Sequence, residues 1–344
     1  RDEVAMTCLP TQHFLYLWYG RDSAWAANTP PDLVLTATLP GGLYNFGRSL
    51  TVLDFDGDTH RDLVLGASSS STSLNAPHVY ILYGRSDGAR HLSTVAAPMN
   101  LSTSTAVTDI TTTPVAGTPN DNDSLGAALG TLQLADGDLA KQDLLIGAPT
   151  ANTAGFTDNG SMYVLNGTAG LQRANVGPLN ITAIATGISR LDGEGNNWFL
   201  GSSFSVGDFD GDMDMDVASG TNAGTLAAAR IFQQTAGGTL EATASANRLY
   251  VGGDLTTSRT EVVTVSAFYG GQQDSLAIGA ENKLYLFSDP AVEHTALQPE
   301  DYLFPVATGL GQRATVGALD INGDGFGDLV LASQVSPGSV QVAY

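Results

Sequence analysis

The stretch Phe46–Ala67, which reads FGRSLTVLDFDGDTHRDLVLGA, decides the fold. In it an Asp-rich loop joins two short apolar segments, and a third segment, HVYILYG, follows from His78. Short runs rich in β-branched and aromatic residues and bounded by Gly, Asn, Asp or Pro are typical of β-strands. We therefore predict two strands joined by the Asp-rich loop, and a third, aromatic strand after a variable loop.

The same unit recurs along the whole chain. Further copies contain LLIGAP from Leu144, DFDGDMDMDVASG from Asp208, SLAIGA from Ser275 and DINGDGFGDLVLAS from Asp320. At the N-terminus RDEVAMT followed by HFLYLWYGR lines up with RDLVLGA followed by HVYILYGR. The last Asp of each loop falls at Asp2, Asp62, Asp143, Asp216, Asp274 and Asp328. Such repetition of one unit is typical of solenoids and propellers.

Each repeat has room for about four short strands, and no segment shows a convincing helical period. A single sheet of this size cannot bury both of its faces, and radial stacking of several sheets solves the problem. We therefore predict an all-β fold, a β-propeller of about seven blades, each a four-stranded antiparallel sheet. Six repeats are visible, the first without its opening strand and the last without its outer strand. Residues 1–344 are expected to form a single domain within a longer chain.

The composition excludes several classes of function. With 42% hydrophobic residues and 40 glycines among 344 residues, the chain has a globular profile. Its 35 acidic residues against 14 basic ones give a formal net charge of −21, which would repel nucleic acid and anionic membrane surfaces. No apolar run approaches the roughly 18 residues of a membrane helix. Cys8 is the single cysteine, so the chain has no internal disulfide.

Three of the loops share one arrangement of oxygen-bearing side chains. Acidic or amide groups occupy the first, third, fifth and ninth positions, and Gly occupies the fourth. These candidate ligands are Asp54, Asp56, Asp58 and Asp62 in the first loop, Asp208, Asp210, Asp212 and Asp216 in the second, and Asp320, Asn322, Asp324 and Asp328 in the third. At the seventh position His60, Asp214 and Phe326 would each contribute a main-chain carbonyl, as in other calcium loops.

Alternate positions of a tight loop converge on one point, and Ca²⁺ requires about six to eight oxygen ligands at about 2.3–2.6 Å. We prefer Ca²⁺ to Mg²⁺ because Mg²⁺ takes fewer protein ligands in a stricter octahedron. Ligation by protein groups alone leaves no open position for a substrate, so the predicted metal is structural and not catalytic. We therefore predict three structural Ca²⁺ sites.

The remaining loops depart from this pattern. The loop Leu134–Asp143 keeps Asp136, Asp138 and Asp143, but Leu134 replaces the first ligand and one residue is inserted, so a fourth site stays open. The loop that ends at Asp274 reads SAFYGGQQD and has lost its acidic ligands, so we expect it to bind no metal.

The repeat resembles the FG-GAP repeat of integrin α-subunits and related propellers over essentially the whole chain. The matching elements are Phe46-Gly47, Gly66-Ala67, Gly147-Ala148-Pro149, Gly279-Ala280 and the three Asp loops. Ala218-Ser219-Gly220 and Ala332-Ser333 depart from the Gly-Ala-Pro element. The resemblance implies structural calcium on one face of the propeller and a partner on the opposite face.

Nothing in the sequence indicates an enzyme. His13 and His78 occupy the same position before the aromatic strand in two repeats, which points to architecture and not to catalysis. No nucleophile-elbow, zinc-ligand or phosphate-loop motif is present.

Four connecting loops are candidates for binding a partner. They are Ser68–Ala76, Ser102–Ser124, Asn152–Gly160 and Leu191–Trp198. Trp198 is either a binding anchor or a residue packed at a junction between blades. Sequons at Asn100, Asn122, Asn159, Asn166 and Asn180 suggest exposed, glycosylated loops.

We expect an extracellular, secreted or cell-surface protein, a calcium-stabilised propeller that binds a protein or glycan as an adhesion module. Two alternatives stay open: a structural subunit of an extracellular surface assembly, and the accessory propeller of a larger surface enzyme. The fold alone does not separate these three functions.

Overall fold

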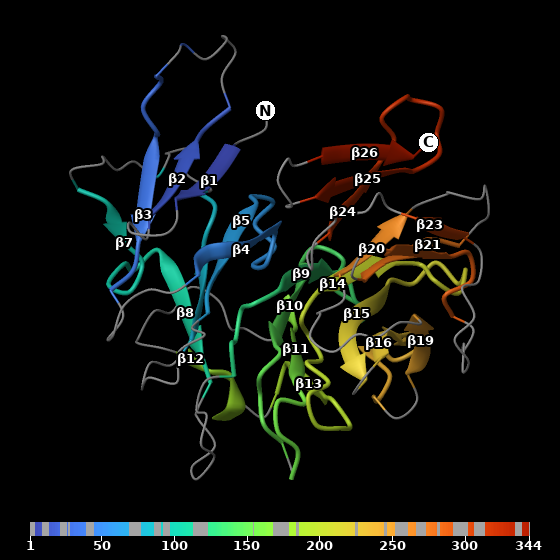
Figure 1. Cartoon of the computed structure of the whole chain (residues 1–344). Coiled ribbons are helices and arrows are strands. Elements are labelled where there is room, and N and C mark those ends of the chain that lie inside the picture. The colour runs from blue at the N-terminus through green and yellow to red at the C-terminus, as the bar shows by residue number, and fades with distance from the viewer. Residues whose placement is uncertain are drawn as a thin grey trace. The chain divides into compact units, whose positions relative to one another are not determined.

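The computed structural model describes most of the chain, and nearly all regular elements of its described part are strands (Figure 1). It describes residues 4–8, 14–20, 26, 28–38, 45–68, 77–85, 91, 97–112, 123–153, 155–167, 179–183, 186–223, 226–243, 246–251, 261–265, 273–280, 283–291, 302–305, 314–333 and 339–343. The short 3₁₀ turn η2 (Ile181–Ala183) is the one helical element that lies wholly within these ranges. No helix among the described residues is long and apolar enough to span a membrane.

The chain divides into two compact units. Unit 1 comprises Arg1–Leu129, Ala140–Leu144 and Leu165–Ile188, and unit 2 comprises Gly130–Leu139, Leu145–Val164 and Ser189–Tyr344. Unit 1 holds two sheets. The first has the order β1 (Val4–Cys8), β2 (Phe14–Trp18), β3 (Leu33–Thr36), β7 (Met99–Asn100), and the second the order β12 (Leu179–Asn180), β8 (Val107–Thr111), β6 (His78–Leu82), β5 (Asp62–Ala67), β4 (Phe46–Leu53).

A third sheet, most of whose residues belong to unit 2, has the order β13 (Ile188–Asp192), β11 (Ser161–Leu165), β10 (Asp143–Ala148), β9 (Leu129–Leu132). Unit 2 holds the rest. Its sheets are β14 (Phe204–Gly207), β15 (Asp216–Ala223), β16 (Leu226–Phe232), β19 (Asn247–Val251); β20 (Glu261–Val265), β21 (Ser275–Ala280), β22 (Lys283–Phe287), β23 (Tyr302–Pro305); and β24 (Ala314–Leu319), β25 (Asp328–Ser333), β26 (Ser339–Ala343). A small hairpin joins β17 (Gln234–Thr235) to β18 (Thr239–Leu240).

These sheets confirm the all-β class and the four-stranded antiparallel blade. Six of the sheets correspond one to one to the six repeats of the sequence. The first and last sheets each have three strands in antiparallel order, as predicted for the incomplete repeats. The count of about seven blades stays a prediction.

The outer strands of the first two sheets carry an addition that the sequence did not predict. The two-residue strand β7 pairs in parallel with β3, and β12 pairs in parallel with β8. In both, the last residue is an Asn whose side-chain Oδ1 accepts a main-chain N–H two residues later, from Ser102 to Asn100 at 3.0 Å and from Thr182 to Asn180 at 3.1 Å. These additions cover part of an otherwise open sheet edge.

The Gly residues of the repeat mark close contacts of main chain with main chain. A Cβ atom placed on Gly66 would lie 2.1 Å from the carbonyl oxygen of Gly126, and one on Gly147 would lie 2.0 Å from that of Gly201. Gly126 and Gly201 adopt positive φ values of 77° and 85°. Because only Gly combines this φ with no side chain, the Gly at the start of one repeat fits against the Gly-Ala strand of the repeat before it.

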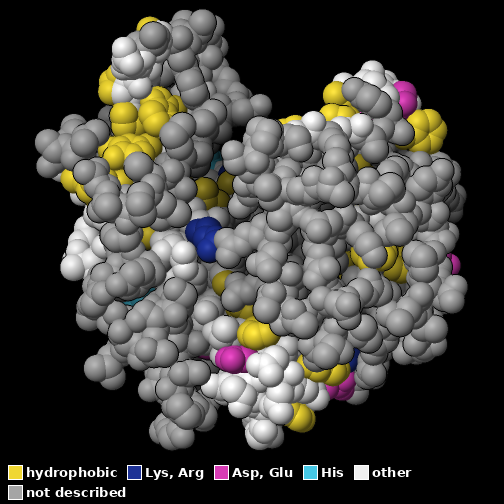
Figure 2. Space-filling model, in the orientation of Figure 1, with side chains coloured by type: hydrophobic (Ala, Val, Ile, Leu, Met, Phe, Trp, Pro, Cys, Tyr) yellow, Lys and Arg dark blue, Asp and Glu magenta, His cyan; other side chains and the backbone are white. Residues whose placement is uncertain are grey.

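The apolar cores lie between consecutive sheets within each unit. In unit 2, Phe209 of the Asp loop is fully buried and packs with Ile231 and with residues of the next sheet, Leu276, Ile278, Tyr285 and Phe287. The second residue of the last Asp loop, Ile321, is by contrast 44% exposed. In unit 1, β2 carries an aromatic row of Phe14, Tyr16 and Trp18, and hydrophobic side chains gather over β2 and β3 at the surface (Figure 2).

Candidate metal centres and binding loops

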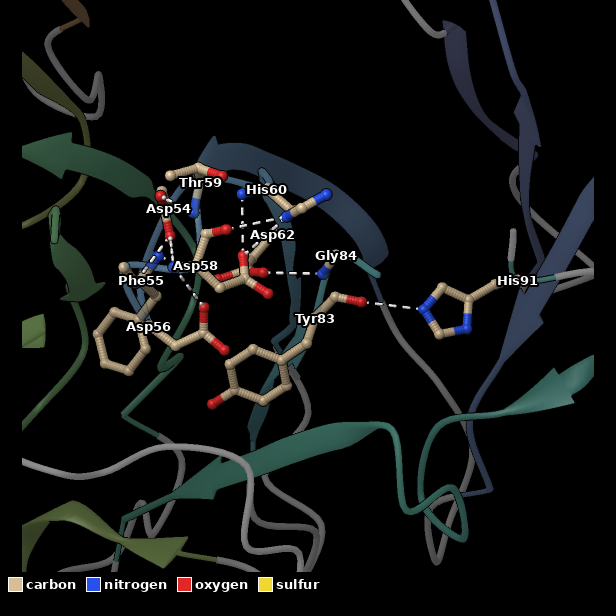
Figure 3. A network of polar contacts seen from close by, with 11 residues as sticks. Asp54, Phe55, Asp56, Asp58, Thr59, His60, Asp62, Tyr83, Gly84 and His91 are labelled. Carbon is tan, nitrogen blue, oxygen red and sulfur yellow. Dashed lines mark hydrogen bonds and ion pairs between the residues drawn. The ribbon is translucent and has the colours of Figure 1, made fainter. Parts of the chain in front are cut away.

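The first Asp loop is organised around the side chain of Asp54. Its Oδ1 accepts the main-chain N–H of Gly57 at 2.8 Å, and its Oδ2 accepts that of Thr59 at 2.8 Å (Figure 3). Gly57 and Thr59 both adopt left-handed φ values, of 74° and 70°. Asp58 Oδ1 accepts the N–H of His60 at 2.9 Å and so braces the second half of the loop.

Asp62 closes this loop from inside the protein. Its fully buried carboxyl accepts the main-chain N–H of Phe55 at 3.0 Å and that of Gly84 at 2.8 Å (Figure 3). Burial raises the pKa of Asp62 to about 7; the two main-chain donors lower it, and the charges of Asp56 and Asp58 raise it. Asp54, Asp56 and Asp62 each place a carboxylate oxygen within 4.8 Å of the others.

The second loop repeats this geometry in unit 2. Asp208 accepts the main-chain N–H groups of Gly211 at 2.7 Å and Met213 at 3.0 Å. The buried Asp216 accepts the N–H of Phe209 at 3.0 Å and that of Gln234 at 2.9 Å. Burial raises the pKa of Asp216 to about 7, and it raises the pKa of Asp210 as well. The oxygens of Asp208, Asp210 and Asp216 lie within 4.8 Å of one another.

The third loop has the same main-chain pattern with fewer carboxylates. Asp320 accepts the N–H groups of Gly323 at 2.6 Å and Gly325 at 2.9 Å. Asp328 is buried and accepts the N–H of Ile321 at 2.8 Å. Asn322 Oδ1, which stands where the other two loops have Asp, accepts the N–H of Asp324 at 2.8 Å.

These arrangements fit a divalent cation. In each of the first two loops three like charges converge, and the most buried of them has a pKa raised toward neutrality because burial and its neighbours disfavour the ionised form. A bound cation would remove that penalty. Asp58 and Asp212 lie outside the close oxygen groups and brace the turns, while the carbonyl role of His60, Asp214 and Phe326 stays a prediction.

The fourth loop is divided between the two units, because Asp136 and Asp138 belong to unit 2 and Asp143 to unit 1. Asp136 Oδ1 accepts the N–H of Asp138 at 3.1 Å. Asp143 is buried and accepts the N–H of Gly167 at 3.0 Å, which matches the contact of Asp62 with Gly84. This contact gives Asp143 a structural role of its own, and a metal in this loop stays a prediction.

The strand register corrects the alignment of the fifth repeat. Asp62 and Asp216 begin β5 and β15 opposite Leu53 and Gly207, and the residue that begins β21 opposite Val265 is Ser275. Asp274 therefore precedes the ninth loop position by one residue. The alignment was wrong because it matched the last Asp and not the Gly-Ala pair. The other residues of that loop, 266–272, lie outside the described residues, so its expected lack of metal stays a prediction.

Two of the predicted binding loops are joined to each other. The main-chain N–H of Thr157 donates to Asn196 Oδ1 at 2.8 Å, and that of Asn197 donates to the carbonyl of Thr157 at 2.9 Å. The segment 193–203 enters β14 at the end of that strand remote from the 208–216 loop. Residues 69–76 and 113–122 of the other two candidate loops lie outside the described residues.

Trp198 is half-buried and its indole ring lies in a stack. The guanidinium of Arg230 lies 4.8 Å from the centre of the indole ring, and Gly195 lies against the same ring. Arg230 is 2% exposed and pairs with Glu194 at 2.8 Å. In the register of its sheet it occupies the place of Tyr80 and Tyr285 in other sheets. The ring therefore packs against β16, and the role of Trp198 as a binding anchor or as a residue at a junction between blades stays a prediction.

The structure corrects the prediction for Asn159 and gives a partner for His78. Asn159 is fully buried and its Nδ2 donates to the carbonyl of Gly193 at 2.6 Å, so this sequon is not in an exposed loop. His78 Nδ1 lies 2.6 Å from Asp109 Oδ1, so this side chain joins β6 to β8, while the absence of a catalytic role stays a prediction. Asn122 and His13 lie outside the described residues.

Comparison with protein families identifies the repeat at residues 46–82, which match the FG-GAP repeat. No curated protein matches the sequence. Among solved structures, the chain is similar to the exotype rhamnogalacturonan lyase YesX, with a TM-score of 0.46 and 12% identity over 86% of this chain and 46% of the lyase. Rhamnogalacturonan lyase YesW gives a TM-score of 0.46 and 13% identity over 96% and 57%. BBS1N in complex with ARL6DN gives 0.43 and 11% over 88% and 80%. The chain thus spans about half the length of the two lyases.

Proposed function

We propose that this chain, in which residues 46–82 are an FG-GAP repeat, is an extracellular β-propeller that is stabilised by Ca²⁺ and binds a protein or glycan. One observation carries the proposal. The Asp loops have equal geometry and join the first and second strands of their blades. Loops 155–160 and 193–199, which are hydrogen-bonded to each other, lie at the opposite end of the strands that they connect. In this proposal the Asp loops bind structural metal, and the loops at the opposite end of the strands bind the ligand.

Ca²⁺ is the metal that the loops suit best. Asp54, Asp56 and Asp62 offer hard oxygen ligands from one loop of nine residues, and Asp208, Asp210 and Asp216 repeat the set. Carboxylates committed to such loops are not available as general acids or bases, so we propose a binding role and not a catalytic one.

The proposed binding platform consists of residues 155–160 and 193–199. Phe156 is 39% exposed, and Thr157, Asn196 and Asn197 are exposed beside it. An exposed aromatic ring among amide and hydroxyl groups suits a ligand that offers both apolar and hydrogen-bonding surface. The bonds between the two loops hold these side chains in place before a ligand arrives, which lowers the entropy cost of binding.

Binding to an array of glycans and extracellular proteins tests this function, with the chain presented in Ca²⁺ and in EDTA. We expect a ligand that Phe156→Ala weakens by at least about tenfold. Leu139→Ala is the matched control, because Leu139 is also an exposed apolar residue, 77% exposed, but lies in an Asp loop. Loss of the ligand with Leu139→Ala and not with Phe156→Ala would place the binding surface at the wrong end of the blades.

A further inference from the structure

Each of the first two Asp loops is held by the residue just before the second strand of the following sheet. The main-chain N–H of Asp54 donates to Gln142 Oε1 at 3.0 Å, and the N–H of Gln142 donates back to the carbonyl of Asp54 at 2.8 Å. In unit 2 the N–H of Asp208 donates to Asp274 Oδ2 at 3.1 Å, and the N–H of Asp274 donates back to the carbonyl of Asp208 at 2.7 Å. The same two-bond bridge is thus made by an amide side chain at one loop and by a carboxylate at the other.

The residues that precede Gln142 and Asp274 also differ in charge. A Cβ atom on Gly57 would lie 2.8 Å from Cγ of Lys141, so the lysine side chain passes over the first loop. At the second loop a Cβ atom on Gly211 would lie 3.7 Å from Oε1 of Gln273, a neutral side chain. The following sheet therefore presents a cation and an amide to the 54–62 loop, and an amide and a carboxylate to the 208–216 loop.

The residues within the two loops differ in charge in the same direction. Residues 54–62 hold four Asp side chains together with Arg61, whereas residues 208–216 hold five Asp side chains and no basic residue. Gln233 adds a neutral contact, from its Nε2 to Asp210 Oδ2 at 2.8 Å. Every charge difference between the two loops favours a cation at 208–216.

We propose that the 208–216 loop is the tighter of the two cation sites and that Asp274 is a positioning residue that raises its affinity. The inference rests on the proposed function, since it takes both loops to be Ca²⁺ sites. Asp274 acts through Asp208: its hydrogen bond fixes the first residue of the loop, and its charge adds to the local field. Gln142 fixes Asp54 in the same way without adding charge.

The size of the effect follows from electrostatics. One carboxylate about 8 Å from a divalent ion, in a water-like dielectric, changes the affinity by about fivefold. We therefore expect Asp274→Asn, which keeps an oxygen acceptor for the N–H of Asp208, to weaken Ca²⁺ binding about threefold to tenfold. The effect should shrink at about 1 M salt, where the Debye length is about 3 Å.

Calorimetric titration with Ca²⁺ alone tests the proposal on single-site variants. Asp56→Ala disables the first loop and Asp210→Ala the second; Ala is chosen because the third loop has Asn322 at this position, so Asn can still be a ligand there. Both variants also carry Asp324→Ala to weaken the third loop. Asp274→Asn is then added to the first variant, and Gln142→Glu, which should strengthen binding about threefold to tenfold, to the second.

Asp158→Asn is the control for a change of charge alone. Asp158 lies in the link between β10 and β11, away from the Asp loops, and its φ of 49° is one that Asn tolerates. Thermal melts check that every variant is folded. Absence of Ca²⁺ binding in the unsubstituted chain would refute the proposed function. Binding with equal affinities at the two loops, or an Asp274→Asn variant that behaves as Asp158→Asn does, would overturn this inference alone.

Discussion

The main-chain N–H of Phe55 donates to the buried carboxyl of Asp62 at 3.0 Å, and so ties the start of the Asp loop to its end. The same bond joins Phe209 to Asp216 at 3.0 Å and Ile321 to Asp328 at 2.8 Å. The ninth position of the loop therefore has a structural role that does not depend on a metal. It holds the loop closed while the other carboxylates converge.

This relationship predicts that Asp62→Ala destabilises the protein even without a metal. The change removes the carboxyl that accepts the N–H groups of Phe55 and Gly84, which costs at least about 2 kcal/mol of the free energy of unfolding. Asp56→Ala, the matched control in the same loop, should cost less than about 1 kcal/mol. Urea denaturation in EDTA measures both, and equal costs would mean that the closing bonds are not important for stability.

Chelation of the metal should lower the melting temperature. Extracellular calcium modules bind with dissociation constants of about 10⁻⁴–10⁻³ M, and at tenfold excess each bound ion adds about 1.4 kcal/mol of stability. Differential scanning calorimetry at a Ca²⁺ concentration about tenfold above the dissociation constant, and then in EDTA, measures the effect. A melt that EDTA leaves unchanged would contradict the assignment of Ca²⁺ to these loops.

The raised pKa values of Asp62 and Asp216 predict a specific pH dependence. Both rise from 3.8 to about 7, so between these values the native state keeps protons that the unfolded state has released. These groups therefore make the calcium-free protein less stable as pH rises from about 4 to about 7, and more stable as it falls. Urea denaturation in EDTA across this range should follow that trend.

Calcium and protons should also compete for the same carboxylates. Binding at about pH 6 is expected to release protons from Asp62 and Asp216, and binding at about pH 8 to release few. Calorimetry in two buffers of different ionisation enthalpy counts the released protons. The same count at both pH values would show that these carboxyls do not titrate near neutrality.

The sequence predicted the repeat and its loops well because the information is local. A loop of nine residues with Asp at alternate positions sets its own geometry, as Asp54 shows by accepting two N–H groups from its own loop. The contacts between repeats were not predictable in this way. The bridge from Asp274 to Asp208 and the burial of Asn159 depend on residues that are distant in sequence, and no local pattern signals them.

Arg230 provides a last prediction, because it replaces the tyrosine that other sheets have at the same register. Arg230→Ala removes a buried side chain that pairs with Glu194, donates to the carbonyls of Thr243 and Ala246 and lies over the Trp198 ring, which should cost about 2–5 kcal/mol. Arg230→Tyr restores the aromatic side chain of Tyr80 and Tyr285 and should cost less, because it fills the space that Ala leaves empty. Urea denaturation ranks the two variants, and an Arg230→Ala protein as stable as the unsubstituted chain would show that the stack with Trp198 contributes little to the packing of the blades.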